Sequence, residues 1–271
     1  MATSPDQNPD NWSAIADAYQ HSFEGLTTRF AADALRRLDL KPGERVIDVA
    51  AGTGAFSLLA AHAGADVLAT DFAPGMVARL RERIAATRLT GISAEVMDGQ
   101  ALAVPDAWFD ASASILGLIF FPDIPRGISE LRRVLRSNGR TAIVCWNDPR
   151  RLELMTLVAQ AVRQVVPTFE PPAVPPVWAQ LSGANLAERM QQSGFRQVEI
   201  ATSTQSLVLD SPESFWNGFA SSVPPLAFLF RQLGPEKTAE VGRAYIAALK
   251  AASDDGVATL RAEACVGIGR A

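Results

Sequence analysis

The feature that most constrains the fold is an alternation of short apolar runs and helical stretches between residues 45 and 146. The runs have the length and composition of buried strands, at 45–50, 66–70, 93–97, 109–115 and 141–146. Helical patterns separate most of them, at 55–63, 74–84 and 123–135, and Asn138-Gly139 is expected to end the last helix. Repeated β–α units predict an α/β fold with a mostly parallel sheet and helices on both faces.

The segments on either side of this core, which we place at 41–150, predict two further parts. Residues 1–40 combine a polar start of eleven residues, expected to be flexible, with two amphipathic helices between Trp12 and Leu38. Residues 151–271 predict a helical cap and two closing strands that complete the sheet. The helices are expected at 152–166, at 185–194 and between 212 and 252, a proline-rich stretch at 167–176, and the strands at 197–209 and 262–269.

Composition narrows the classes of partner. The chain has 25 basic and 29 acidic residues and a net charge of −4, so no basic surplus is available to neutralise a phosphate backbone, and we expect no nucleic-acid partner. Cys145 and Cys265 match no metal-ligand spacing, so we expect neither a metal nor a disulfide. The sequence has no export signal and no long apolar run, so we predict a cytoplasmic protein without membrane association. Whether the chain forms a homodimer is left open.

Two short motifs follow the first two predicted strands. Gly52-Thr53-Gly54 stands between a strand and a helix, where missing side chains let a ligand approach backbone N–H groups. Asp71 ends the second strand, where a carboxylate can accept hydrogen bonds from both ribose hydroxyls. Taken alone, the first motif could be a tight turn and Asp71 a helix cap. Together they predict a nucleotide-containing ligand.

Four segments in this order resemble Rossmann-like (class I) S-adenosylmethionine (SAM) dependent methyltransferases, and most closely the group that includes ubiquinone and menaquinone biosynthesis enzymes. They are 46–54, 70–76, 97–110 and 131–140. The chain departs from that pattern at Ala51, where many members have cysteine, and at 137–139, where a proline-containing turn is more usual. The resemblance implies a seven-stranded sheet, an N-terminal helical lid and a cap insertion, with SAM as cofactor, S-adenosylhomocysteine as product and no metal.

The resemblance also implies roles for individual residues around SAM. Ala50 and Gly52 would lie against its methionine part, within the turn that Asp48, Thr53 and Gly54 complete. Asp71 would hold the ribose, and Ser114 and Ile115 would border the sulfonium. The adenine would be held by five residues, with Phe72 and Met76 on its faces, Asp98 at its exocyclic amine, and the backbone of Gly99 and Gln100 at its ring nitrogens.

Few residues are candidates for the reaction itself. His21 and Tyr19 belong to the lid, where they could serve as a base or contact the ligands. Residues 117–121 are apolar throughout, which argues against an acid–base role there, and His62 is expected to be structural. An apolar acceptor pocket is predicted from Trp12, Ile119, Trp146, Trp178 and Phe228. The leading hypothesis is in-line methyl transfer to a small, largely apolar metabolite.

Two alternatives stay open. A nicotinamide-dependent oxidoreductase would also use Gly52, Gly54 and Asp71, although its fingerprint needs glycine or alanine where this chain has Ser57. A SAM-binding protein that transfers no methyl group, either regulatory or using the sulfonium only as a charge, would need the same binding residues and no base.

Overall fold

The computed structural model describes residues 4–148, 151–169, 181–252 and 257–271. In this part of the chain, seven strands form one sheet in the order β3-β2-β1-β4-β5-β7-β6. The strands are β1 (Arg45–Val49), β2 (Asp66–Asp71), β3 (Ile92–Val96), β4 (Phe109–Ile115), β5 (Leu135–Trp146), β6 (Arg196–Leu209) and β7 (Ala258–Arg270). Strands β1 to β5 are parallel, whereas β7 is antiparallel to both of its neighbours. The predicted mostly parallel sheet is confirmed.

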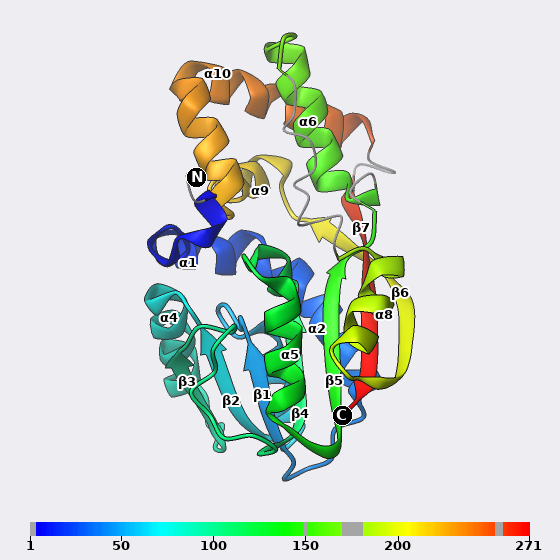
Figure 1. The fold of residues 1–271 in the computed structure, drawn as a ribbon. Coiled ribbons are helices and arrows are strands. Elements are labelled where there is room, and N and C mark those ends of the chain that lie inside the picture. The colour runs from blue at the N-terminus through cyan, green and yellow to red at the C-terminus, as the bar shows by residue number, and fades with distance from the viewer. Residues whose placement is uncertain (1–3, 149–150, 170–180, 253–256) are drawn as a thin grey trace.

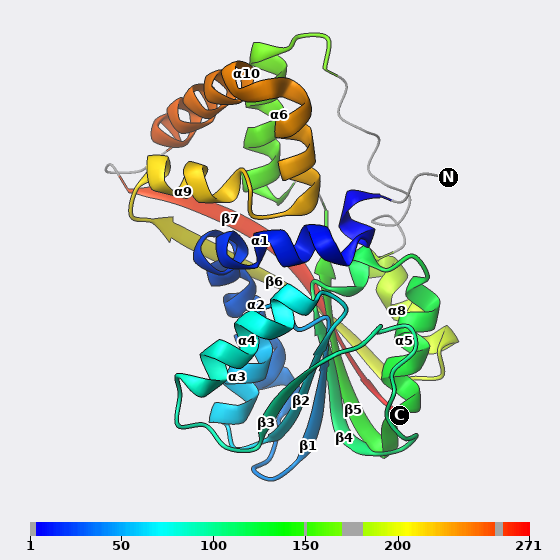
Figure 2. The same cartoon turned by 90° about the vertical axis from the view of Figure 1, so that its left-hand side faces the viewer.

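Helices cover both faces of this sheet, as Figure 2 shows. One face carries α2 (Glu24–Leu38), α3 (Ala55–His62) and α4 (Pro74–Ala85), and the other carries α5 (Ile124–Arg133) and α8 (Gly183–Gln192). The core between these layers consists of aliphatic and aromatic side chains such as Phe30, Ile47 and Ile128, each less than 2% exposed. Burial of this apolar surface is the main force that holds the layers together.

The remaining helices lie beyond the carboxyl ends of the strands (Figure 1). They are α6 (Glu153–Val165), α9 (Pro212–Phe219) and α10 (Pro224–Ala251), which form the cap, and α1 (Pro9–Ser22), which lies between the cap and the sheet. Gly234, with φ of 79°, bends α10 just before Pro235. Among the described residues, no helix is both long and apolar enough to cross a membrane.

Several boundaries differ from those expected, among them the start of β7 at Ala258 and the two that follow. Helix α5 ends at Arg133 instead of reaching the Asn138-Gly139 turn, because β5 begins at Leu135 and pairs with Phe109. The N-terminal helices begin earlier than the eleven-residue polar start suggested: η1 (Pro5–Gln7) is a short 3-10 helix, and α1 follows from Pro9. Local capping explains the early start, since the Asn8 side chain accepts a hydrogen bond from the Asp10 N–H.

Candidate active site at the carboxyl ends of the strands

A cavity of about 360 Å³ lies where β1, β2 and β4 end, beneath α1 and the cap. The strand ends and the segments that follow them supply Ala50, Gly52, Asp71, Phe72, Met76, Met97, Asp98, Gly99, Gln100, Ile115, Leu116, Gly117, Ile119, Phe120, Phe121, Pro122 and Trp146. The N-terminal helices and the cap region supply Gln7, Trp12, Tyr19, Phe23, Leu152, Leu154, Met155, Val223, Pro225 and Leu226. The size and largely apolar lining are typical of small-molecule sites in open α/β sheets.

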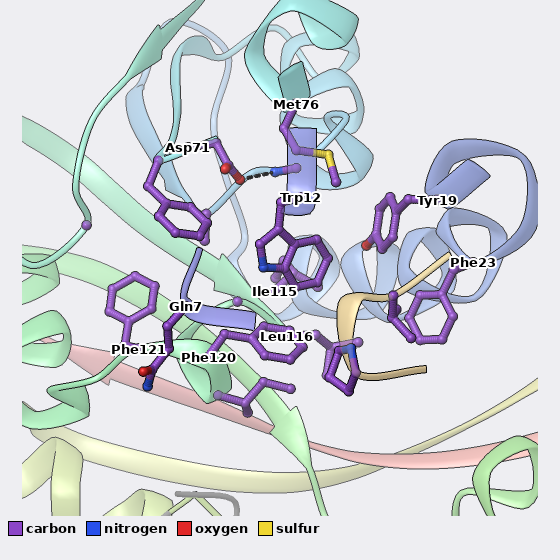
Figure 3. A pocket seen from close by; sticks show the side chains of 18 of the residues that line it. Gln7, Trp12, Tyr19, Phe23, Asp71, Met76, Ile115, Leu116, Phe120 and Phe121 are labelled. Atoms are coloured by element: carbon purple, nitrogen blue, oxygen red, sulfur yellow. Dashed lines mark hydrogen bonds between the residues drawn. The ribbon is translucent and has the colours of Figure 1, made fainter. Parts of the chain in front are cut away.

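The loop after β1 is shaped for close approach of a ligand. Ala50 and Gly52 have φ angles of 57° and 56°, in the left-handed region that a residue with a side chain rarely adopts. The N–H of Gly52 donates to Asp71 Oδ2 over 2.8 Å (Figure 3), and the N–H of Ala73 donates to Asp71 Oδ1 over 2.9 Å. Asp71 therefore fixes the glycine loop from the neighbouring strand, and burial raises the pKa of its carboxyl to about 6.

Several predicted cofactor residues lie behind the cavity wall. Asp48 is buried and accepts a hydrogen bond from Ser57 Oγ over 2.5 Å, and burial raises the pKa of its carboxyl to about 7. Gly54 faces Leu80 of α4, so the missing side chain there serves helix packing. Ser114 Oγ is buried without a hydrogen-bond partner in the described part of the chain. None of these three residues lines the cavity: Asp48 binds α3, Gly54 packs against α4 and Ser114 lies within β4.

The end of β4 forms the opposite wall. Leu116 also has a left-handed backbone, with φ of 59°, and Gly117 follows it. A Cβ added to Gly117 would lie 2.5 Å from the Cβ of Ala50, so the loops after β1 and β4 approach as closely as glycine allows. Two adjacent loops with unusual backbone at the same cavity indicate a functional site, because such strain persists where the surrounding structure imposes it.

The loop after β3 closes the polar end of the cavity. Asp98 Oδ1 accepts from the backbone N–H of Gln100 over 2.9 Å and from its side chain over 3.2 Å. Gly99 has no room for a side chain, since a Cβ would lie 2.5 Å from Phe121 Cζ and 2.7 Å from Val49 Cγ1. The loop therefore presents backbone and a carboxylate at one edge of the cavity.

Helix α1 covers this end and is held by polar contacts with α4. Ser13 Oγ accepts from the N–H of Gly75 over 3.0 Å, and Arg79 donates to Gln20 over 2.7 Å. Trp12 packs edge-on against Phe120 with ring centroids 4.9 Å apart. Figure 3 shows Trp12 in the middle of the cavity, facing the loops. The lid position predicted for the N-terminal helices corresponds to this arrangement.

Beside the glycine loop, one buried ion pair joins three elements. Arg83 Nη1 of α4 donates to Glu24 Oε1 over 2.5 Å and to Glu24 Oε2 over 2.7 Å. The same nitrogen donates to the carbonyl oxygen of Thr53 over 2.6 Å, and Thr53 Oγ1 donates to Glu24 Oε2. Thr53 therefore anchors the loop to the first turn of α2 without lining the cavity.

The other end of the cavity is apolar. Its lining is Phe23, Trp146, Leu152, Leu154, Met155, Val223, Pro225 and Leu226, and Figure 3 shows Phe23 on the side away from Asp71. Of this set, only Trp146 is predicted from the sequence as a pocket residue. The others lie on helices or connections whose apolar residues have the spacing of ordinary core positions, and only the tertiary fold brings them to the strand ends. Phe23 is the one member that the sequence could have indicated, because it continues the helical spacing of Trp12 and Tyr19.

The cavity brings together most of the predicted residues, namely Trp12, Tyr19, Ala50, Gly52, Asp71, Phe72, Met76, Asp98, Gly99, Gln100, Ile115, Ile119 and Trp146. It does not include His21, whose side chain is 62% exposed and whose Nδ1 contacts the carbonyl oxygen of Asp17. His21 lies two residues after Tyr19, about 200° around the helix, and so faces away from the cavity.

Phe228 also lies outside the lining of the cavity: it is 42% exposed and two residues beyond the inward-facing Leu226. Trp178 lies outside the described residues.

Comparison with known proteins shows which family this chain resembles. Residues 47–143 match the methyltransferase domain family. An uncharacterised protein of Mycobacterium tuberculosis is 36% identical over 132 residues, which are 49% of this chain and 48% of that protein. The chain thus spans about half the length of the uncharacterised mycobacterial proteins that it matches. Demethylmenaquinone methyltransferase of Corynebacterium glutamicum is 34% identical over 172 residues, 59% of this chain and 71% of that enzyme.

Solved structures share the fold at low sequence identity. The YcgJ protein of Bacillus subtilis superposes with a TM-score of 0.59 and 15% identity, covering 89% of this chain and 97% of that one. The cyclase SpnF gives a TM-score of 0.54 with 19% identity, covering 90% and 80%. Because the sequence match to the corynebacterial enzyme extends over most of that protein, the chain belongs to the family of Rossmann-like SAM-dependent methyltransferases.

Proposed function

We propose that this protein transfers the methyl group of SAM to a small, largely apolar metabolite. The observation that carries the proposal is the single cavity described above, with its two unlike ends. The polar end has a glycine loop held by Asp71 and a second carboxylate, Asp98, whereas the apolar end has only aliphatic and aromatic side chains among the described residues. One end suits an adenosyl group and the other suits an apolar acceptor.

The residues present fit the cofactor. The left-handed Ala50 and Gly52 leave the loop without bulky side chains on its cavity side, where the methionine part would lie. Asp71 would accept the ribose hydroxyls, and Phe72 and Met76 would contact the adenine, with Asp98 at its amine. Tyr19 lies near this loop, with its Cε1 3.7 Å from the position of a Cβ on Gly52. Ser114 Oγ, buried and unpartnered among the described residues, lies 3.2 Å from the position of a Cβ on Gly117.

The sulfonium of bound SAM supplies an activated methyl group, so the protein needs mainly to position the acceptor. The loops at Ala50 and Gly117 fix the place of the reacting centre from two strands. Trp12 and Tyr19 close it from α1 and exclude water, and Phe23 and Trp146 orient a flat acceptor against the apolar end. Positioning in a closed, apolar site is the contribution that these residues can make to the rate.

The test is calorimetric titration with SAM, S-adenosylhomocysteine and NADH, repeated on Asp71→Ala and Asp71→Asn. We expect both adenosyl ligands to bind and NADH not to bind. Asp71→Ala removes the ribose acceptor and the support of the loop, so affinity should fall by at least tenfold, with a smaller loss for asparagine. Binding of NADH alone, or unchanged SAM affinity in Asp71→Ala, would overturn the assignment.

A methyl gain detected by mass spectrometry in an acceptor screen then separates methyl transfer from SAM binding without transfer. That alternative has some support in the fold, which the chain shares with a cyclase. Acceptors from the apolar, conjugated class are the first to screen, because the apolar end lacks charged side chains among its described residues.

A further inference from the structure

The cavity has a charge pattern that restricts the acceptor further. Three titratable side chains line it among the described residues, namely Tyr19, Asp71 and Asp98, and none of these residues is a lysine, arginine or histidine. Asp71 and Asp98 belong to the end where the adenosyl group is proposed to lie, whereas Tyr19 also reaches the apolar end, with its ring centroid 5.7 Å from that of Phe23. Apart from the Tyr19 phenol, the apolar end therefore offers no described group that could take a proton from the acceptor, and it offers none that could neutralise a fixed negative charge on it.

The histidines cannot supply the missing base. The whole sequence contains two, His21 and His62. His21 is exposed on the far side of α1, as described above. His62 is exposed at the end of α3, and its Nδ1 lies 2.7 Å from the carbonyl oxygen of Leu58. Neither lines the cavity.

The three titratable lining residues are also poor proton acceptors for the apolar end. Burial raises the pKa of Tyr19 above its ordinary value, so its phenol stays protonated at neutral pH and pairs with Thr27 Oγ1 at 3.1 Å. Both oxygens of Asp71 accept backbone N–H groups, and Asp98 Oδ1 is engaged by Gln100. These contacts hold the carboxylates at the polar end.

From this pattern, and resting on the proposed function, we infer that the acceptor is a phenol or enol that reacts as its anion, having released its proton to water and not to the protein. In the transfer, the anionic oxygen forms a bond to the methyl carbon while the carbon–sulfur bond breaks. The electron pair of that bond stays on sulfur, so one cation and one anion become a neutral ether and a neutral thioether.

The apolar walls favour such a reaction. A lone anion in an apolar cavity is costly, but an anion beside a cation is stabilised there more than in water, because the surroundings screen the attraction weakly. The pair loses its charges as the methyl group moves, so the reaction needs no compensating side chain at the acceptor. An acceptor with an additional carboxylate or phosphate would keep a negative charge that no described lining residue pairs with, and we expect it to be excluded.

Asp6 is a carboxyl near the cavity that could act as a base without lining it. Asp6 lies in the same 3-10 helix as the lining residue Gln7, and its Oδ1 is buried without a hydrogen-bond partner among the described residues. Its side chain does not line the cavity. Asp6→Asn and His21→Ala are therefore the two variants that would reveal a protein base.

The experiment uses 4-nitrophenol, whose absorbance reports its own ionisation, in complexes with S-adenosylhomocysteine and with the unreactive cationic analogue sinefungin. A pH titration of the bound probe gives its apparent pKa in each complex. We expect the cationic complex to favour the anion by at least tenfold, a shift of at least one pH unit. Met155→Lys should produce a similar shift with S-adenosylhomocysteine, because half-buried Met155 lines the apolar end, and Met155→Gln is the matched neutral control.

The outcomes separate this inference from the function on which it rests. If S-adenosylhomocysteine fails to bind in calorimetry, the proposed function falls. If it binds, the inference is overturned by failure of the probe to bind, by equal ionisation in both complexes, or by a shifted ionisation of the probe in Asp6→Asn or His21→Ala. An anion preference that needs the cationic analogue or Met155→Lys, and that both base variants retain, supports it.

Discussion

Replacing Arg83 by methionine tests whether the buried ion pair holds the lid helices to the glycine loop. The side chain of Glu24 is 7% exposed and that of Arg83 is 26% exposed. Methionine keeps the apolar stem of arginine but removes the donor to both Glu24 oxygens and to the Thr53 carbonyl. Among the described residues, the carboxylate of Glu24 then stays buried with only Thr53 Oγ1 as a donor.

Breaking a buried pair from one side costs about 3–5 kcal/mol, because it leaves an uncompensated charge. Since Arg83 is a quarter exposed and water can reach the vacated position, we expect a loss of about 3 kcal/mol in the free energy of unfolding. At about 2–4 °C per kcal/mol, Tm should fall by about 6–12 °C. The double variant Arg83→Met/Glu24→Gln removes the buried charge itself, and should recover about 1 kcal/mol or more.

Urea denaturation followed by tryptophan fluorescence measures these differences, with S-adenosylhomocysteine affinity by calorimetry as the functional readout. Because Thr53 is anchored by the same pair, the single variant should also bind the ligand more weakly. A loss below 1 kcal/mol for Arg83→Met, or a double variant no more stable than the single one, would show that this ion pair does not hold the lid helices to the loop.

Three further outcomes are expected. Burial raises the pKa of Asp48 to about 7, above about 3.9 for an unfolded aspartate, so folding takes up a proton and this group's contribution to stability falls as pH rises from 4 to 7. Asp48→Asn cannot ionise and should gain stability relative to the wild type across that range in urea titrations, by up to about 1.4 kcal/mol per pH unit; a constant difference would contradict this. Gly117→Val should weaken S-adenosylhomocysteine binding at least tenfold in calorimetry, because its Cβ would lie 2.5 Å from that of Ala50. Gly25→Ala is the control and should leave binding unchanged, because its Cβ would make only an ordinary contact with Leu207 at 3.8 Å. His21→Ala should leave ligand affinity within about twofold, given its exposed position, and a larger loss would return His21 to the site.

Features that depend on local pattern could be predicted before the fold was known. Apolar runs of strand length alternating with helical stripes specified the parallel part of the sheet, because periodicity records which faces are buried. Gly52 and Asp71 were found for the same reason, since a loop that approaches a ligand needs a particular residue type at a position fixed by the strand before it. The positions of Trp12 and Tyr19 followed from one helical stripe.

Other features depend on contacts between distant segments, which a local sequence pattern does not encode. Trp146, Leu154 and Leu226 share a cavity although they lie on separate elements, and each alone has the character of a core residue. His21 and Phe228 do not line the cavity, because a rotation of about 200° from an inward neighbour turns a side chain outward, and the direction of a helix face is set by packing partners. The ion pair between Glu24 and Arg83 joins residues 59 positions apart, so only the folded arrangement reveals it. Local chemistry thus indicated the polar end of the cavity, whereas the apolar end, assembled from distant segments, is apparent only in the folded chain.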